Sequence, residues 1–174
     1  MTAQRRAVFL DRDGVLVQAA PQKAYAHGPL TLEDFALIPG IVEPVRRIHD
    51  AGFLTVLATN QPAISRGQMT WDILNEMHRL LRAAVPLDDL EVCPHTNSDN
   101  CPCRKPKPGM LLAAAEKHNI DLPASYFIGD TFRDVDAARA AGVTPVLIDW
   151  PYNQDLEVSH RVKDLDEAAR LIIG

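Results

Sequence analysis

The sequence lacks any long hydrophobic run. Its longest apolar stretches, residues 54–58 and 143–148, are far too short to span a bilayer. Arg5 and Arg6 are followed by only four apolar residues before Asp11, so no signal peptide is visible. We therefore expect a cytoplasmic protein without a membrane partner.

Positive charge is also scarce. Eighteen Lys and Arg residues stand against 23 Asp and Glu residues, which gives a net charge of −5. A nucleic-acid surface would need Lys and Arg clustered over a whole face, so we expect no nucleic-acid partner. An anionic small molecule would instead need a local island of positive charge.

Signatures of several other enzyme classes are missing. The six histidines form no Ser-His-Asp arrangement, and there is no Walker-type glycine loop. Only three cysteines are present, Cys93, Cys101 and Cys103, and all lie within eleven residues. An odd, clustered set in a chain without a secretion signal indicates metal ligands rather than a disulfide framework.

Short apolar runs that end abruptly in polar residues dominate the rest. They cover residues 7–10, 53–58, 126–128 and 143–148, with a possible fifth at residues 91–92. Continuous apolar strands are typical of parallel sheets. Helical patterns lie between them: residues 71–84 with Thr70 as cap, a helix to His118 with Pro108 in its first turn, residues 134–141 stopping at Gly142, and a last helix from Asp164 through Ile172.

This alternation predicts a doubly wound α/β fold, a Rossmann-like three-layer sandwich with a mainly parallel sheet. The 174 residues fit a single domain, residues 1–174, and we expect a monomer. The irregular, Pro-bearing segment 17–39 is expected to form loops over one end of the sheet, without a large cap domain. Trp71 and Trp150 are expected to pack, and His49, His78, His118 and His160 to be surface residues.

Polar side chains follow four of these runs, and in open α/β sheets ligands bind beyond the carboxyl ends of strands. Asp11, Asp13, Thr59, Asn60 and Asp130 should therefore converge. Of two acids separated by one residue, one can attack phosphorus and the other can handle the proton. Gly14 lets the backbone turn sharply beside them. Alone, this D-x-D-G pattern is weak, because acidic turns are common.

Further residues support phosphoryl chemistry. Asp130 suits Mg²⁺, which prefers oxygen ligands. Asp134 could orient that metal shell, or could equally be an N-terminal helix charge. Thr59 and Asn60 offer a hydroxyl and an amide to phosphate, and Lys105 can neutralise the transferring group.

A second metal site is predicted in the loop that carries the cysteines. Cys93-Pro-His95, five further residues and Cys101-Pro-Cys103 supply three thiolates and an imidazole. Four such ligands make a closed tetrahedral Zn²⁺ site, so the zinc is expected to be structural. It would order a polar, Pro-rich loop and hold Arg104 and Lys105, which follow directly.

Taken together, DRDG at 11–14, TNQ at 59–61, RKPKPG at 104–109 and GD-x3-D at 129–134 resemble the four motifs of the haloacid dehalogenase superfamily. The resemblance implies Asp11 as nucleophile, Asp13 as acid/base, and Thr59 and Lys105 on the phosphate. It also implies Mg²⁺ on Asp11, the Asp13 carbonyl and Asp130. The predicted substrate-binding residues are Arg12, Asn60, Gln61, Arg66 and Arg104.

The zinc loop resembles one branch, which contains D-glycero-D-manno-heptose 1,7-bisphosphate phosphatases and histidinol-phosphate phosphatases. K-P-G-M-L after the loop and the S-R-G-x-x-T stretch at 65–70 favour the heptose side, as do Tyr25 and His27. Thr131 stands where that branch commonly has a Lys that touches substrate. The resemblance implies removal of the 7-phosphate of a sugar bisphosphate, with histidinol phosphate or another small sugar phosphate as the alternative substrate. Arg66, Arg104 and Lys107 offer charge for a second phosphate, although Arg66 could equally be a solvated loop charge.

Two other classes of protein fit the sequence less well. A receiver-type signalling domain shares the fold, but its phosphoacceptor follows a middle strand, whereas D-x-D here follows the first. A zinc-dependent interaction module would require loss of catalytic residues, and none is missing.

Overall fold

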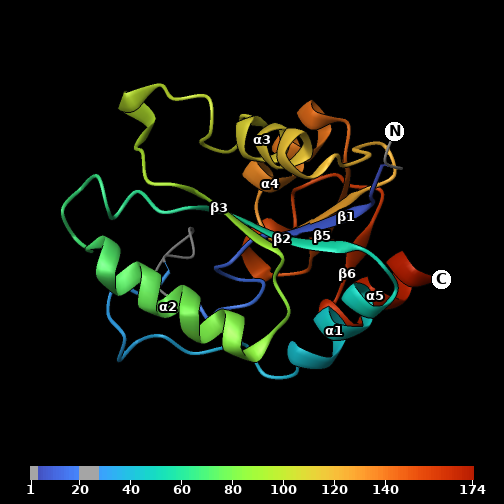
Figure 1. Cartoon of the computed structure of the whole chain (residues 1–174), viewed down its shortest axis with the longest axis horizontal. Coiled ribbons are helices and arrows are strands. Elements are labelled where there is room, and N and C mark those ends of the chain that lie inside the picture. Colours follow the sequence, from blue (N-terminus) through green and yellow to red (C-terminus); the bar gives the residue numbers. More distant parts are fainter. Residues whose placement is uncertain (1–3, 20–27) are drawn as a thin grey trace.

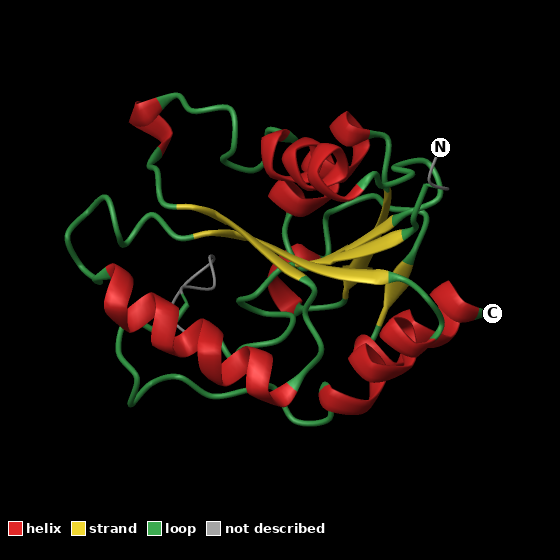
Figure 2. Cartoon of the chain, in the orientation of Figure 1, coloured by secondary structure: helices red, strands yellow, loops and turns green. Residues whose placement is uncertain are grey.

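The computed structural model describes residues 4–19 and 28–174, and its centre is a six-stranded sheet (Figures 1 and 2). The strands are β1 (Ala7–Leu10), β2 (Leu54–Asn60), β3 (Asp89–Cys93), β4 (Tyr126–Gly129), β5 (Thr144–Ile148) and β6 (Arg161–Val162). Their order is β3-β2-β1-β4-β5-β6, and every neighbouring pair is parallel. The predicted Rossmann-like sandwich is confirmed.

The register of the sheet brings the motif residues together. Leu10, the last residue of β1, pairs with Leu57 on one side and with Ile128 on the other. The loops that follow β1, β2 and β4 therefore leave the sheet at the same edge. Asp11 and Asp130 begin two of these loops, and Thr59 is the second-last residue of β2, so the predicted convergence has a geometric cause.

Within the described part of the chain, five α-helices cover the two faces of the sheet. They are α1 (Val42–Asp50), α2 (Trp71–Ala84), α3 (Gly109–His118), α4 (Phe132–Ala141) and α5 (Leu165–Ile173). Figure 1 shows α3 and α4 above the sheet, and α1, α2 and α5 below it. One apolar cluster packs the sheet against α1 and α5, and another packs it against α3 and α4. Burial on both faces explains why the central strands are continuously apolar.

Most helix boundaries follow the predicted signals. Thr70 caps α2 by accepting a hydrogen bond from the Ile73 N–H at 3.3 Å, and Gly142 ends α4 with φ +76°. The start of α4 differs from the prediction, because Thr131 and Asp134 form a capping box that begins the helix at Phe132. Pro108 occupies the N-cap of α3 rather than its first turn.

Two elements were not predicted. Helix α1 includes Pro44, but a proline in the first turn costs no hydrogen bond, because the N–H there has no helical partner. Strand β6 has only two residues, too few for a periodic pattern.

Two predictions of side-chain exposure were wrong. His78 is only 4% exposed, because α2 turns it toward Arg12 and Asp13. Trp71, expected to pack, is 45% exposed at the first position of α2. Tyr25 and His27 lie outside the described residues. Among the described helices, none has the length and apolar content needed to cross a bilayer.

Candidate active site

Asp11 follows β1 and lies at the centre of the site. Its Oδ1 accepts hydrogen bonds from the Arg12 N–H at 2.8 Å and from Lys105 Nζ at 2.9 Å. Among the described residues, none donates a hydrogen bond to its other oxygen, Oδ2. Burial and then the charge of Asp134 raise the pKa of Asp11 to about 7, while Lys105 opposes this rise. One carboxylate oxygen is thus held in place and the other is available for chemistry.

Lys105 is a buried cation shared by two acids. Its Nζ donates to Asp11 Oδ1 at 2.9 Å, to Asp134 Oδ1 at 2.6 Å and to the Ala58 carbonyl at 2.8 Å. Burial alone would lower the pKa of Lys105, but the charges of Asp11 and Asp134 raise it. Lys105 therefore stays protonated beside Asp11 and offers positive charge where a phosphoryl group would lie.

Asp134 has the helix N-terminal role that was one of its two expected roles, and its part in a metal shell stays a prediction. Its Oδ2 accepts from the N–H groups of Asp130 and Thr131 at 3.1 and 3.0 Å and from Thr131 Oγ1 at 3.0 Å, which caps α4. Its Oδ1 anchors Lys105. One carboxylate oxygen each of Asp11, Asp130 and Asp134 also lie within 4.8 Å of one another.

Asp130 carries a buried oxygen without a partner. Tyr152 donates its hydroxyl to Oδ2, and Asn153 Nδ2 donates to the Asp130 carbonyl at 2.8 Å. Among the described residues, Oδ1 has no hydrogen-bond partner. Burial and then the charge of Asp11 raise the pKa of Asp130. A buried carboxylate oxygen without a partner is costly, and a divalent cation would satisfy it, so this acidic group fits Mg²⁺.

Two glycines permit this crowding. A Cβ on Gly14, whose φ is +86°, would lie 2.1 Å from Asp130 Oδ2. A Cβ on Gly129 would lie 2.2 Å from the Cβ of Asp134. Larger residues at either position would push the acids apart.

Arg12 and Gln61, predicted to bind substrate, are buried behind Asp13. Arg12 is 0% exposed; its Nε donates to Asp13 Oδ1 at 2.9 Å, and one terminal nitrogen reaches Oδ2 at 3.2 Å. Gln61 Nε2 donates to Asp13 Oδ2 and to Thr59 Oγ1, both at 2.9 Å. The structure therefore places both residues where they hold Asp13, and their contact with substrate stays a prediction.

The other predicted cationic side chains differ in how many hydrogen bonds they already make within the protein. Lys107 Nζ donates hydrogen bonds to Asn100 Oδ1 at 2.8 Å and to the Cys101 carbonyl at 2.9 Å. Arg104 donates to Asn97 Oδ1 at 2.7 Å and to the His95 carbonyl at 3.0 Å. Burial and then the charge of Arg133 lower the pKa of Arg104, and the charge of Arg66 adds to this decrease. Arg66 itself is exposed.

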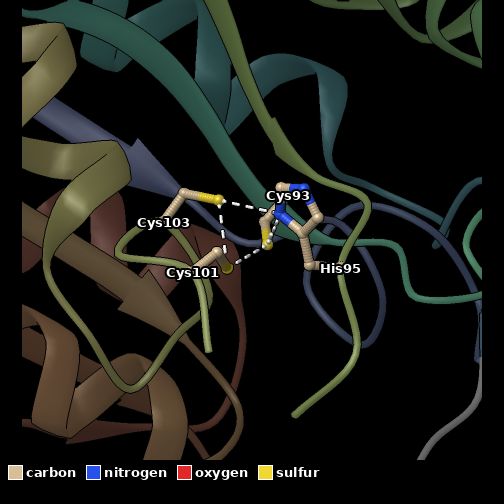
Figure 3. Close-up of side chains that lie close together, drawn as sticks. All are labelled: Cys93, His95, Cys101 and Cys103. Atoms are coloured by element: carbon tan, nitrogen blue, oxygen red, sulfur yellow. Dashed lines mark hydrogen bonds between the residues drawn. The ribbon is translucent and has the colours of Figure 1, made fainter. Parts of the chain in front are cut away.

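The predicted zinc ligands converge (Figure 3). Cys93 Sγ lies 3.6 Å from Cys101 Sγ and 3.6 Å from His95 Nδ1, and Cys103 Sγ lies 3.4 Å from both Cys101 Sγ and His95 Nδ1. A tetrahedron with bonds of about 2.3 Å has edges of roughly 3.8 Å, so the four atoms match a closed zinc site. Strand β3 delivers Cys93, and the loop back to Lys105 supplies the other three.

Sequence reasoning missed the turn after β5. Tyr152 and Asn153 contact Asp130 from 22 and 23 positions along the chain. Neither belongs to a spaced motif, so no local signal could have placed them there.

Comparison with known proteins agrees with this geometry. The HAD-hydrolase-like family matches residues 102–165. The D-glycero-beta-D-manno-heptose-1,7-bisphosphate 7-phosphatase of Pseudomonas putida is 42% identical over 148 residues, which cover 82% of each chain. The protein of that name from Escherichia coli K12 is 34% identical, with 94% of this chain and 97% of the relative covered.

Solved structures point the same way. A crystal structure of D,D-heptose 1,7-bisphosphate phosphatase from B. bronchiseptica, complexed with magnesium and phosphate, has a TM-score of 0.84 and 30% identity, covering 97% of this chain and 98% of that one. The D,D-heptose 1,7-bisphosphate phosphatase from Burkholderia thailandensis has a TM-score of 0.67 and 26% identity, covering 98% and 99%. The chain belongs to the haloacid dehalogenase-like phosphatases, in the family that contains these heptose bisphosphate phosphatases.

Proposed function

We propose that residues 1–174 form one hydrolase domain that removes the 7-phosphate of D-glycero-D-manno-heptose 1,7-bisphosphate. One observation carries the chemistry: Lys105 and the Arg12 N–H hold Asp11 Oδ1, while no donor within residues 4–19 and 28–174 bonds to Asp11 Oδ2. The names of the relatives support the substrate.

The acidic group supports a catalytic Mg²⁺. Asp11, the Asp13 carbonyl and Asp130 would hold it, with Asp134 beside them. When bound, Mg²⁺ supplies positive charge that offsets the charge on the phosphoryl oxygens.

The first step forms an aspartyl phosphate. Asp11 Oδ2 attacks phosphorus, and the bond from phosphorus to the sugar oxygen breaks. Asp13, held by Arg12 and Gln61, gives its proton to that leaving oxygen. Lys105 and Thr59 bind the phosphoryl oxygens during transfer.

The second step restores the enzyme. Asp13, now a carboxylate, takes a proton from a water molecule, and the water oxygen attacks phosphorus. The bond from phosphorus to Asp11 breaks, inorganic phosphate forms and the Asp11 carboxylate is regenerated. Both roles of Asp13 need one fixed position, which the contacts from Arg12 and Gln61 provide.

Two arginines support a second phosphate on the substrate. The positive charge of Arg66 acts on Arg104, in a protein whose net charge is −5. Guanidinium groups bind phosphate bidentately, which would orient the distal end of a bisphosphate. Arg104 and Lys107 both bond within the zinc loop, but Arg104 does so through Nε and one terminal nitrogen and has a second terminal nitrogen, whereas the single side-chain nitrogen of Lys107 already donates twice there. Lys107 therefore takes no part in this proposal.

A structural zinc completes the proposal. Cys93, His95, Cys101 and Cys103 would bind it and so order the loop that ends in Arg104 and Lys105.

The test is kcat/KM for heptose 1,7-bisphosphate and for histidinol phosphate, measured with Mg²⁺ on one preparation. We expect faster cleavage of the bisphosphate, with the 7-phosphate released. Faster cleavage of histidinol phosphate would replace the proposed substrate, and no cleavage of either compound would remove both.

A further inference from the structure

The turn that follows β5 donates hydrogen bonds to the active site, although it belongs to none of the four sequence motifs. It includes the short 3-10 helix η2 (Pro151–Asn153) and the preceding Trp150. Trp150 Nε1 donates to the Gly14 carbonyl at 3.0 Å, Tyr152 donates to Asp130 Oδ2, and Asn153 Nδ2 donates to the Asp130 carbonyl at 2.8 Å. Three side chains within four residues thus contact the loops after β1 and β4.

This turn is itself held in place. The rings of Trp150 and Tyr152 stack with centroids 6.1 Å apart and planes 7° apart. Arg161, on β6, donates to Asn153 Oδ1 at 3.0 Å, to the Asn153 carbonyl at 3.1 Å and to the Leu156 carbonyl at 2.7 Å. The Tyr152 hydroxyl therefore approaches Asp130 from a braced position.

The hydrogen bond from Tyr152 involves only one of the two carboxylate oxygens of Asp130. Oδ2 accepts from Tyr152, whereas Oδ1 is buried and has no partner among the described residues. Gly14 packs against both groups, since a Cβ there would lie 3.1 Å from the Tyr152 hydroxyl oxygen. The carboxylate consequently has little room to rotate.

We propose that Tyr152 is a positioning residue for the divalent cation: its hydroxyl holds Oδ2 of Asp130, so that Oδ1 is presented as the metal ligand. This inference rests on the proposed Mg²⁺ site. A hydrogen bond to the outer oxygen of a ligating carboxylate fixes its orientation, and loss of such a contact typically weakens metal affinity. Without the hydroxyl, Asp130 can turn and share its oxygens differently, and each bound cation must then reorder it.

The experiment compares Tyr152→Phe with the parent chain by calorimetric titration with Mg²⁺ alone. Tyr152→Phe keeps the stacked ring and removes only the hydroxyl. Tyr126→Phe is the matched control, because it removes the same hydroxyl from a tyrosine elsewhere in the fold. Tyr126 is the first residue of β4, and its ring packs edge-on against that of Phe53, with ring centroids 6.2 Å apart. We expect about tenfold weaker Mg²⁺ binding for Tyr152→Phe and unchanged binding for the control.

Activity provides the second readout. The Mg²⁺ concentration for half-maximal activity should rise by the same factor in Tyr152→Phe, while kcat at saturating Mg²⁺ returns to the parent value. Arg161→Met, which loosens the turn from outside the site, should shift Mg²⁺ affinity in the same direction by a smaller factor. If Tyr152→Phe does not fold, Arg161→Met decides alone.

Two results would overturn the inference. One is a Tyr152→Phe protein that binds Mg²⁺ as tightly as the parent. The other is a loss of kcat that saturating Mg²⁺ does not restore, which would indicate a general structural role. A parent chain that binds no Mg²⁺ would overturn the proposed metal site itself.

Discussion

Asn60 and Lys105 hold each other through two hydrogen bonds, although 45 positions separate them. Asn60 Nδ2 donates to the Lys105 carbonyl at 3.0 Å, and the Lys105 N–H donates to Asn60 Oδ1 at 3.0 Å. The end of β2 is thereby fastened to the end of the zinc loop. The pair fixes the backbone from which the Lys105 ammonium reaches Asp11, so Asn60, predicted to bind substrate, has a clear positioning contact.

Asn60→Ala should lower kcat/KM by about 10²-fold, because a misplacement of about 1 Å at a reacting group can cost that much. Zinc content should stay unchanged, since the Asn60 side chain bonds to the Lys105 backbone, and the pairing of Asn60 with Cys93 in the sheet is made by the backbone, which the substitution keeps. Steady-state kinetics and elemental analysis check the two parts. Kinetics equal to those of the parent would show that Lys105 does not need this anchor.

Asp11→Asn should abolish turnover, because an amide cannot form the aspartyl phosphate. Asp13→Asn should still allow slow formation of a phospho-enzyme, which then persists because no base activates water. We expect its kcat to fall by about 10²–10⁴-fold. Intact-protein mass spectrometry after mixing with substrate detects the trapped adduct.

Two outcomes would contradict these roles. Substantial turnover by Asp11→Asn would exclude it as the nucleophile. Dephosphorylation of Asp13→Asn at the parent rate would assign the proton transfer to another group.

Cys101→Ser should remove the zinc and lower thermal stability and activity together, since metal binding and loop order are coupled. Ser98→Ala is the matched control, because Ser98 lies in the same loop and offers no zinc ligand. Elemental analysis and thermal melts provide the measurement. Protein purified without chelator that contains no zinc would refute the site.

Arg66→Ala should lower kcat/KM for the bisphosphate by about 10–100-fold, the worth of a hydrogen bond to a charged group. A sugar carrying only the 7-phosphate should be cleaved as by the parent, because it has nothing for Arg66 to bind. Lys107→Ala removes a charge from the same region and should leave this selectivity intact. Indifference of the bisphosphate to Arg66→Ala would assign the second phosphate elsewhere.

His78 should make stability depend on pH. Burial and then the charge of Arg12 lower the pKa of His78 from 6.5 to about 4. The unfolded chain therefore binds a proton more readily, and stability is lost as pH falls from 6.5 toward 4, by about 3 kcal/mol from this residue.

The variant His78→Leu lacks the pH-dependent contribution of His78 to the free energy of unfolding. Denaturant unfolding of both proteins above pH 6.5 sets their baseline difference. That difference should then move in favour of the variant as pH falls. Parallel curves for the two proteins across the window would show that His78 does not couple protonation to folding.

Much of the fold could be predicted because its signals are local. An apolar run that ends in Asp11 or Gly129-Asp130 predicts a buried strand delivering polar residues to an edge, and the sheet has those strands. The spacing of Cys93, His95, Cys101 and Cys103 likewise places all four predicted zinc ligands within eleven residues, and the structure brings them together.

Which charged and polar side chains are buried could not be predicted from the sequence, because burial depends on contacts between segments that are distant along the chain. Nothing near Arg12 in the chain indicates that Gln61 and Met77 enclose its guanidinium group. His78 looks like a polar helix residue until α2 is placed over the loop that carries Arg12.

The sequence by itself determined which groups are available: two acids after β1, a lysine after the zinc ligands and a third acid after β4. Only the tertiary structure decided how each is used. Parallel pairing in register brings the ends of β1, β2 and β4 to one edge, where Lys105 is shared between Asp11 and Asp134. The same packing sets Tyr152 on Asp130, because a hydrogen bond depends on distance in space and not on separation along the chain.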